Sequence, residues 1–407
     1  MQNQHKIFGS ALLVAGTAIG AGMLALPITT TIGGTWAALT LLILCFLFML
    51  INVFILLEAC FYSPKKQANI ISVVHACLGP WATGIAWLTY LLLLYAVLAA
   101  YIAGSGELIA GVLANFGWQL SPQILAVIFT ALFSIIIYSK TRGVDHFNRI
   151  FMLCIFASFL LLCVGITVKA DFEFITPGKP KYLWSAIPVV ILAYTSHLIV
   201  PSIKEYLGND VKRIKKALLL GCLIPFLLYL TWEVLLIATL PATGPFSLMA
   251  IAQSKNSIVA VANVLSNHLG IASIMFLVIV FSFSALASSF LGASLSLIDF
   301  LIDGLQMSKT TKGRLSILSM SIIPPLLFAL FFPYGFVLAL GYAGIFVAIL
   351  FGILPILVLW ESRYRKKLSS PYCAPVGKTG LILLLLMSVA IIFLQLATTF
   401  GWLPSIK

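Results

Sequence analysis

The chain has 407 residues, of which 62% are hydrophobic and only 9% are charged, and its mean hydropathy is +1.13. A soluble globular domain cannot bury so large an apolar fraction, so we expect a protein that crosses a membrane many times. The formal net charge of +13 does not by itself indicate a nucleic-acid partner, because basic residues also collect in the loops on one side of a membrane.

The first apolar stretch, about residues 7–31, contains the sequence AGTAIGAGMLALP at 15–27. It is too long for a signal peptide, and we expect it to stay in the protein as a span. Gly16, Gly20, Gly22 and Pro27 all weaken a helix. Gly16 and Gly20 alone would fit a helix-packing motif. Together with Pro27, they favour an unwound segment that binds a polar ligand.

Eleven stretches are long and apolar enough to span a bilayer. With the N-terminus in the cytoplasm, 19 of the 24 lysines and arginines fall on the cytoplasmic side. The exceptions are Lys169, Lys179, Lys181, Lys255 and Lys407. This bias predicts a cytoplasmic N-terminus and a periplasmic C-terminus. The spans lie near residues 7–31, 34–60, 80–108, 121–139, 149–168, 183–203, 216–240, 270–302, 315–332, 335–360 and 378–402.

A second break falls in the sixth span, where ILAYTSHLIVPSI at 191–203 interrupts an apolar helix. The two breaks therefore open two groups of five spans. Because five is odd, the groups would cross the membrane in opposite directions, as inverted repeats do. We predict a first repeat at 1–168, a second repeat at 183–361, and a last helix within 376–407.

Unwound backbone in a membrane is tolerated only where a ligand or water meets its N–H and C=O groups. The starts of half-helices suit a carboxylate, and free carbonyls suit an ammonium group. One amino-acid zwitterion satisfies both. The predicted substrate-binding residues at the two breaks are therefore Gly16, Thr17, Ile19, Gly20, Ala21, Gly22, Tyr194, Thr195, Ser196 and His197.

Several segments also carry a resemblance to a known family. They are VAGTAIGAGMLALP at 14–27, AAYIAGSGEL at 99–108, FNR at 147–149, VPSI at 200–203, SSFLGASLSLIDFL at 288–301 and FALFFPYGFVLALGYAG at 328–344. Over its whole length the chain resembles the bacterial hydroxy and aromatic amino acid permeases of the amino acid–polyamine–cation superfamily. The resemblance implies an all-α polytopic membrane protein with the LeuT-like fold, which has five-plus-five inverted repeats, an eleventh helix, and broken helices 1 and 6.

The resemblance further implies uptake of an aromatic amino acid, L-tyrosine first, across the bacterial inner membrane by proton symport. One segment departs from the family pattern. The sixth-span break of the family has two glycines around its histidine, whereas this chain has Tyr194-Thr195-Ser196-His197-Leu198. Side chains therefore stand where bare backbone is expected, which leaves Trp, Phe, Ser and Thr open as alternative substrates.

Proton coupling needs a titratable group inside a span. His197 lies in the middle of the sixth span, and Glu107 and Glu233 lie in the outer halves of the third and seventh. Glu58 and Asp299 lie near cytoplasmic helix ends, where we expect the wet interface to hold them.

Small residues recur at Ser284, Ser288, Gly292 and Ser296, a spacing that is typical of close helix packing. By analogy with sodium-coupled relatives in the superfamily, an alternative is a Na⁺ site. Its ligands would be the Ser288 and Ser289 hydroxyls and the carbonyls of Gly16 and Ile19.

An aromatic substrate also needs an apolar cavity with a polar tip. Tyr95 and Tyr101 in the third span, with Phe281 and Ser284 in the eighth, are predicted to face the region where the broken helices meet.

The seven cysteines form no CxxC pair or metal-ligand spacing, and we expect no cofactor and no resident metal. The expected partners are an amino-acid substrate and the lipid bilayer, without nucleic acid, and the expected state is a monomer. The loops leave no room for a catalytic domain, so an enzyme is not expected. The remaining functional alternatives are a Na⁺-coupled or other neutral amino-acid transporter and an amino-acid sensor built on a transporter fold.

Overall fold

The computed structural model describes residues 2–20, 22–63, 69–138, 141–168, 178–208, 210–241, 243–254, 257–305 and 311–404, and these ranges fold into helices without a strand. The predicted site residue Ala21 lies outside the described residues. The helices are α1 (Gln2–Ala18), α2 (Gly22–Thr30), η1 (Thr31–Gly33), α3 (Thr35–Phe61), α4 (Ile70–Leu78), α5 (Pro80–Asn115), α6 (Pro122–Tyr138), α7 (Thr141–Thr167), η2 (Pro180–Ser185), α8 (Ile187–Ala193), η3 (His197–Ile199), α9 (Val200–Tyr206), α10 (Val211–Thr239), α11 (Leu248–Gln253), α12 (Ser257–Leu269), α13 (Ala272–Leu305), α14 (Thr311–Phe331), α15 (Phe336–Val347), η4 (Ala348–Ile353), α16 (Leu354–Trp360), η5 (Glu361–Arg365) and α17 (Lys378–Thr399).

Each predicted span corresponds to a helix or to consecutive helices of this structure. In the described ranges, 9 helical segments are long and apolar enough to cross a membrane, and the bent pair α1 and α2 makes a tenth. The predicted span at 121–139 is α6, a shorter apolar helix of 17 residues. The all-helical membrane fold is thus confirmed. The division into repeats at 1–168 and 183–361, with a last helix within 376–407, stays a prediction.

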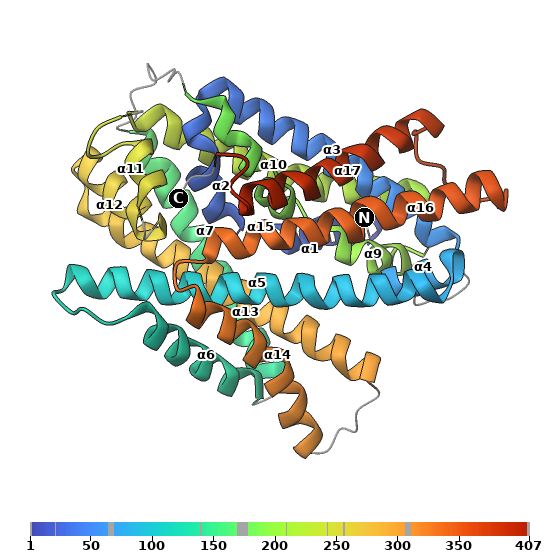
Figure 1. Cartoon of the computed structure of the whole chain (residues 1–407), viewed down its shortest axis with the longest axis horizontal. Helices are drawn as coiled ribbons and strands as arrows, with labels where there is room; N and C mark the ends of the chain where they lie inside the picture. The colour runs from blue at the N-terminus through green and yellow to red at the C-terminus, as the bar shows by residue number, and fades with distance from the viewer. Residues whose placement is uncertain are drawn as a thin grey trace.

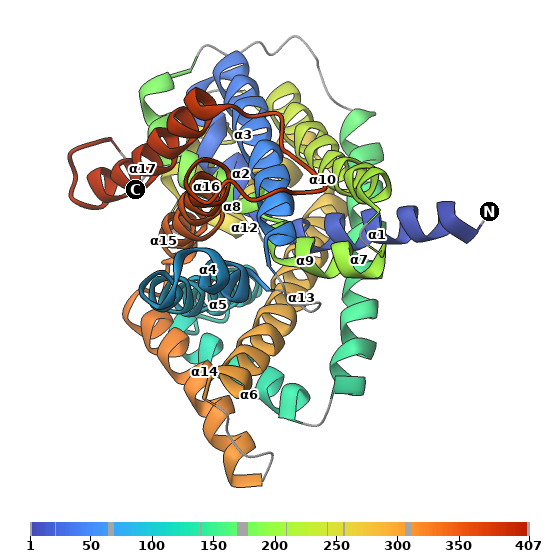
Figure 2. The ribbon, with the colours of Figure 1, turned by 90° about the vertical axis from the view of Figure 1, so that its right-hand side faces the viewer.

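The long helices run roughly side by side and define two ends of the molecule (Figure 1). We call the end with α11 and α12 the α12 end, and the end with α4 and α9 the α4 end. The view along the helices shows α1 reaching outward from the other helices (Figure 2). The helix α1 packs against α10, α2 packs against α8, and α13 packs against α5 and α7.

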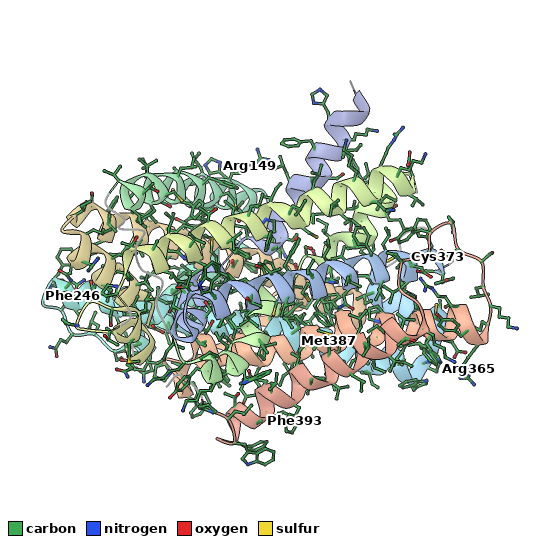
Figure 3. The ribbon with its side chains drawn as sticks, turned by 90° about the horizontal axis from the view of Figure 1, so that it is seen from above. Arg149, Phe246, Arg365, Cys373, Met387 and Phe393 are labelled. Atoms are coloured by element: carbon green, nitrogen blue, oxygen red, sulfur yellow. The ribbon has the colours of Figure 1, made fainter. Side chains whose placement is uncertain are left out.

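The flanks of the bundle are apolar. Met387 and Phe393 on α17 point away from the other helices (Figure 3), and their exposed fractions are 47% and 57%. Leu153 on α7 and Phe331 on α14 are exposed as well. Such a continuous apolar exterior fits contact with lipid chains and not with water.

Both predicted breaks are present. The first span is bent by 56° between α1 and α2. In the sixth span, α8 ends at Ala193, and a short helix, η3, precedes α9. Pro201 lies in the first turn of α9, where its missing N–H is harmless, so that proline favours a helix start at this point.

One expectation about a helix end was wrong. Glu58 does not sit in a wet interface, because its side chain is fully buried at the α4 end. The Arg363 guanidinium donates two hydrogen bonds to its carboxylate, one of them from Nε over 2.6 Å. The Ala374 N–H and the Tyr62 hydroxyl donate two more, over 2.6 and 2.8 Å. The ion pair joins the end of α3 to η5, and Asp299 is exposed as expected.

Candidate functional site

The two broken spans touch each other at their breaks. A Cβ atom at position 22 would lie 3.1 Å from the Cα of Ala193. This is closer than ordinary van der Waals contact, and the obstacle is backbone. The start of α2 and the end of α8 can therefore approach this closely because residue 22 is glycine.

Helix ends of opposite polarity gather at this contact. α1 ends at Ala18 and α8 ends at Ala193, and the last carbonyls of a helix carry partial negative charge. α2 begins at Gly22, where the N–H groups carry partial positive charge. The Tyr229 hydroxyl of α10 lies 2.7 Å from the carbonyl oxygen of Ala18 and 3.1 Å from that of Ala193.

A cavity of about 500 Å³ extends from the breaks toward the α4 end. This volume falls within the range of small-molecule sites, about 300–1,000 Å³. Among the predicted site residues, the ones that line it come from α1, the α1–α2 link, α2, α5, the residues after α8, and α13. They are Gly16, Thr17, Ile19, Gly20, Gly22, Tyr101, Thr195, Ser288 and Ser289.

Among the described residues, the two sides of the cavity differ in exposure. On its α4 side, Leu12 and Leu13 are 48% and 55% exposed, and Gly16 and Thr17 are exposed too. Beyond the break, residues 23–30 of α2 are all buried. On the α12 side of the site, α2 is therefore surrounded by other helices, while α1 on the α4 side borders an opening of the cavity.

The glycines of the first span have different surroundings. A Cβ atom on Gly16 would meet nothing within 4 Å, and the same holds for Gly292 of α13. A Cβ atom on Gly20 would lie 2.5 Å from Oγ of Ser289. Helix packing therefore does not explain Gly16 or Gly292, which face the cavity, and the packing interpretation of the α13 stripe is wrong at Gly292.

Polar side chains lie along the α13 wall of the cavity. The Ser288 hydroxyl donates to the Asn148 Oδ1 of α7 over 2.6 Å. Ser289 is hydrogen-bonded to the Tyr101 hydroxyl of α5. The Ser296 hydroxyl donates to the Gly292 carbonyl over 3.0 Å. These groups give an otherwise apolar cavity several hydroxyls and an amide that can meet a polar substrate atom.

The four residues of the alternative cation site, Gly16, Ile19, Ser288 and Ser289, line the same cavity. They supply only oxygen ligands, which suit a hard cation such as Na⁺. In the described part of the chain, no group of three or more His, Cys, Asp or Glu side chains could hold a metal ion.

The two threonines of the breaks keep their hydroxyls on their own helices. The Thr17 hydroxyl donates to the Val14 carbonyl over 2.7 Å, and the Thr195 hydroxyl donates to the Ile191 carbonyl over 3.2 Å. Both hydroxyl oxygens keep lone pairs that can accept from a substrate.

Three predicted lining residues face elsewhere. The Tyr95 hydroxyl donates to the Met320 carbonyl of α14 over 2.8 Å. Residues 95 and 101 are six positions apart, which separates them by about 120° around a helix, and of the two only Tyr101 lines the cavity. Phe281 is buried against Trp232, with ring centroids 6.0 Å apart, and Ser284 is buried on the α12 side of the cavity-lining part of α13.

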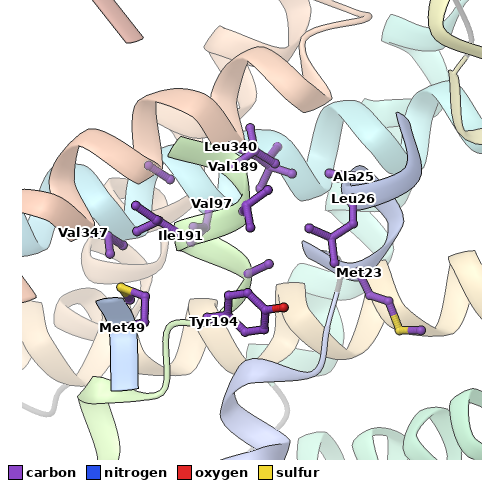
Figure 4. Close-up of a cluster of buried hydrophobic side chains, with 14 of the residues drawn as sticks. Met23, Ala25, Leu26, Met49, Val97, Val189, Ile191, Tyr194, Leu340 and Val347 are labelled. Carbon is purple, nitrogen blue, oxygen red and sulfur yellow. The ribbon is translucent and has the colours of Figure 1, made fainter. Parts of the chain in front are cut away.

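The sixth-span break places its other side chains behind the cavity wall. The Tyr194 ring lies among buried apolar side chains, with its hydroxyl directed to the side of Met23 (Figure 4). Ser196 contacts the Cys222 sulfur at 3.5 Å. His197 is fully buried and stacks on Phe351 with ring centroids 5.0 Å apart. These three residues are not part of the cavity lining.

The two outer carboxylates differ in their surroundings. Glu107 of α5 is buried against the start of α12, where its Oε1 accepts a hydrogen bond from the Ile258 N–H over 3.2 Å. Glu233 of α10 is fully buried and is hydrogen-bonded through Oε1 to the Thr30 hydroxyl at the end of α2. In the described part of the chain, Oε2 of Glu233 has no hydrogen-bond partner.

Sequence reasoning missed the backbone carbonyls of Ala18 and Ala193, which carry no side-chain signal. It also missed Tyr229, although Phe226, Tyr229 and Glu233 recur at i, i+3 and i+7 on α10 and so share one face. Asn148 was found only as part of the FNR segment, without a role.

The chain matches the family model described as the tryptophan/tyrosine permease family over residues 3–395. It is 34% identical to tyrosine-specific transport system 1 of Haemophilus influenzae, covering 98% of this chain and 99% of that protein. Identity to tyrosine-specific transport system 2 of the same organism is 32%, covering 98% of both chains. Identity to its tryptophan-specific transport protein is 27%, covering 99% of both.

A solved structure shares the fold. The chain resembles a manganese transporter of Eremococcus coleocola with a TM-score of 0.62 at 13% identity, covering 99% of this chain and 89% of that one. At this identity the likeness concerns the fold alone.

Proposed function

Because the chain belongs to the tryptophan/tyrosine permease family, we propose that it is a secondary transporter that imports an aromatic amino acid, with L-tyrosine as its first substrate. The observation that carries this proposal is a cavity that the ends of both broken helices line together. The names of the tyrosine- and tryptophan-specific relatives support the substrate class. Phenylalanine, serine and threonine are the further alternatives.

The substrate would bind as a zwitterion at the contact of the two breaks. Its ammonium group would donate to the carbonyls of Ala18 and Ala193, and its carboxylate would face the N–H groups at the start of α2 near Gly22. Its ring would extend along the α5, α7 and α13 walls, where Tyr101 of α5 and Asn148 of α7 offer partners for a phenol hydroxyl.

We place the α4 end in the cytoplasm and the α12 end in the periplasm of the bacterial inner membrane, with the N-terminus inside and the C-terminus outside. The distribution of basic residues supports this orientation. The cavity then opens to the cytoplasm, which makes this an inward-facing state. In transport, the spans built from α1, α2, α3, α8, α9 and α10 would rock against those built from α5, α6, α13 and α14. A monomer suffices for this mechanism.

Glu233 is our first choice for the coupled proton. The Thr30 hydroxyl has one proton and two acceptors, the Leu26 carbonyl at 2.7 Å and the Glu233 carboxyl. If that proton goes to Leu26, Glu233 must itself be protonated and donate to Thr30. If Glu233 is ionised, Thr30 donates to it instead. The donor and the acceptor of the hydrogen bond between α2 and α10 therefore exchange roles when Glu233 gains or loses its proton.

His197 and Glu107 are weaker choices for the proton site. His197 lies behind the cavity wall against Phe351, and Glu107 accepts the Ile258 N–H at the start of α12. Sodium coupling through Gly16, Ile19, Ser288 and Ser289 is the second candidate mechanism, and the common cavity favours it as the alternative. A sensor built on this fold would bind the same ligand without moving it across the membrane.

The test is uptake of radiolabelled tyrosine by the purified protein in liposomes, with an inward proton gradient or an inward sodium gradient. Unlabelled tryptophan, phenylalanine, serine and threonine serve as competitors. We expect accumulation with the proton gradient alone and competition by aromatic amino acids only. Accumulation that requires sodium would replace the proton mechanism, and binding of tyrosine without uptake would favour a sensor.

A further inference from the structure

The Tyr229 hydroxyl contacts the same two backbone carbonyls to which the ammonium group of the proposed substrate would donate. Tyr229 is fully buried, and its oxygen lies between the last carbonyl of α1, at 2.7 Å, and the last carbonyl of α8, at 3.1 Å. Both carbonyl-bearing residues, Ala18 and Ala193, line the cavity. One side chain of α10 thus joins the two broken spans.

The Tyr229 hydroxyl cannot satisfy both carbonyls at once. A phenol has a single proton, so Tyr229 can donate fully to only one of the two carbonyls at a time. Two helix ends of the same negative partial charge face this one donor. An ammonium group has three N–H donors and a full positive charge, and it can satisfy both carbonyls at once.

Packing explains the ring of Tyr229 but not its hydroxyl. The ring lies 5.4 Å from the Tyr194 ring, centroid to centroid, within an apolar surrounding that phenylalanine would fill equally well. The buried Tyr194 hydroxyl beside it has no hydrogen-bond partner in the described part of the chain, whereas the Tyr229 hydroxyl contacts two carbonyls from two different interrupted helices.

We propose that the Tyr229 hydroxyl stands in for the ammonium group of the substrate while the carrier is empty. This inference rests on the proposed function, since it requires an amino acid at the breaks. When the ammonium group binds, the carbonyls of Ala18 and Ala193 gain a better donor. The hydrogen bonds from Tyr229 are then no longer needed to join α1 to α8. When the substrate leaves, Tyr229 again holds α1 and α8 together, so that the empty carrier can return.

Two steps of the transport cycle depend on the Tyr229 hydroxyl to different degrees. Net uptake requires the return of the empty carrier, in which Tyr229 is the donor. Exchange of external for internal amino acid uses only the loaded carrier, in which the substrate is the donor. Removing the hydroxyl should therefore slow net uptake and spare exchange, and it should not weaken substrate binding.

The test compares Tyr229→Phe with the wild type and with Tyr90→Phe in liposomes. Tyr90 of α5 is a matched control, because it packs on Phe300 with ring centroids 4.7 Å apart and does not line the cavity. We expect Tyr229→Phe to reduce gradient-driven net uptake at least fivefold, to keep tyrosine–tyrosine exchange within about twofold, and to bind tyrosine as tightly as the wild type or more tightly. Such a fivefold loss corresponds to about 1 kcal/mol.

Other results would contradict either this inference or the proposed function. An equal loss of uptake and exchange in Tyr229→Phe would overturn the inference in favour of a structural role. Weaker binding of tyrosine would overturn it in favour of direct substrate contact. Rates in Tyr229→Phe equal to those in Tyr90→Phe would show that the hydroxyl has no role. If the wild type itself exchanges no amino acid, the proposed function fails instead.

Discussion

The glycines of the first span provide a graded test of the site, because their surroundings differ. We consider Gly16→Ala, Gly20→Ala and Gly22→Ala. The added methyl group meets nothing within 4 Å at position 16, the Ser289 hydroxyl oxygen at 2.5 Å at position 20, and the Ala193 backbone at 3.1 Å at position 22.

The expected magnitudes follow from these contacts. Gly16 lies inside α1, where alanine is favoured over glycine by up to about 1 kcal/mol, so Gly16→Ala should keep or raise the stability. In Gly20→Ala, the Ser289 side chain can rotate away, so we expect a small loss. In Gly22→Ala, α8 must shift, and overpacking of this kind costs about 1–3 kcal/mol.

The assay is the thermal unfolding midpoint of the three purified variants in detergent, followed by tyrosine uptake in liposomes. The expected order of stability is Gly16→Ala first, Gly20→Ala second and Gly22→Ala last. If Gly16 and Gly20 were instead a packing motif, Gly16→Ala would be among the most damaging changes. A midpoint for Gly16→Ala below that of Gly22→Ala would refute the geometry of the two breaks.

Four further predictions follow from single contacts. Glu58→Leu should lower stability by about 3–5 kcal/mol, because the Arg363 guanidinium, which is only 13% exposed, then lacks a carboxylate partner. The double variant Glu58→Leu with Arg363→Met should recover most of this loss in a double-mutant cycle. Glu233→Gln should abolish accumulation driven by a proton gradient but retain exchange, and the same result for Glu107→Gln instead would move the coupling site to α5. In Ser288→Ala, uptake driven by the proton gradient should proceed without sodium, as in the wild type. If half-maximal uptake by Ser288→Ala instead needs a higher sodium concentration than uptake by the wild type, the cation site is favoured. Tyr101→Phe should raise the KM for tyrosine more than Tyr95→Phe does, since only Tyr101 lines the cavity, and equal effects would contradict the assigned helix face.

Features that depend on the local sequence were predicted well. Long apolar stretches identified the spans, because the bilayer fixes the length of a spanning helix. Gly22, Pro27 and Pro201 marked the two breaks, because glycine and proline act on the backbone where they stand. Residues close to the breaks, such as Gly16 and Thr195, line one cavity, and their role in substrate binding stays a prediction.

Features that depend on helix rotation or on distant pairing were not predictable in this way. Tyr95 and Tyr101 belong to one apolar helix, and only packing decides which face meets the breaks. Glu58 and Arg363 are 305 positions apart, and neither shows in the sequence that the other is its partner.

The main polar groups of the site also escaped sequence analysis. The carbonyls of Ala18 and Ala193 belong to the backbone, so no residue type reveals them. Tyr229 could be recognised as their donor only after the ends of α1 and α8 had been placed beside α10.

The most direct test of the site is equilibrium binding of radiolabelled tyrosine to the purified protein, with two analogues as competitors. Tyramine lacks the carboxylate, and 3-(4-hydroxyphenyl)propionate lacks the ammonium group. A site that pairs both charges with helix ends should bind each analogue at least about 100-fold more weakly than tyrosine, because buried polar groups are then left unpaired. Displacement of tyrosine by the deaminated acid at similar concentrations would contradict the role of the Ala18 and Ala193 carbonyls, and absence of tyrosine binding would contradict the proposed substrate.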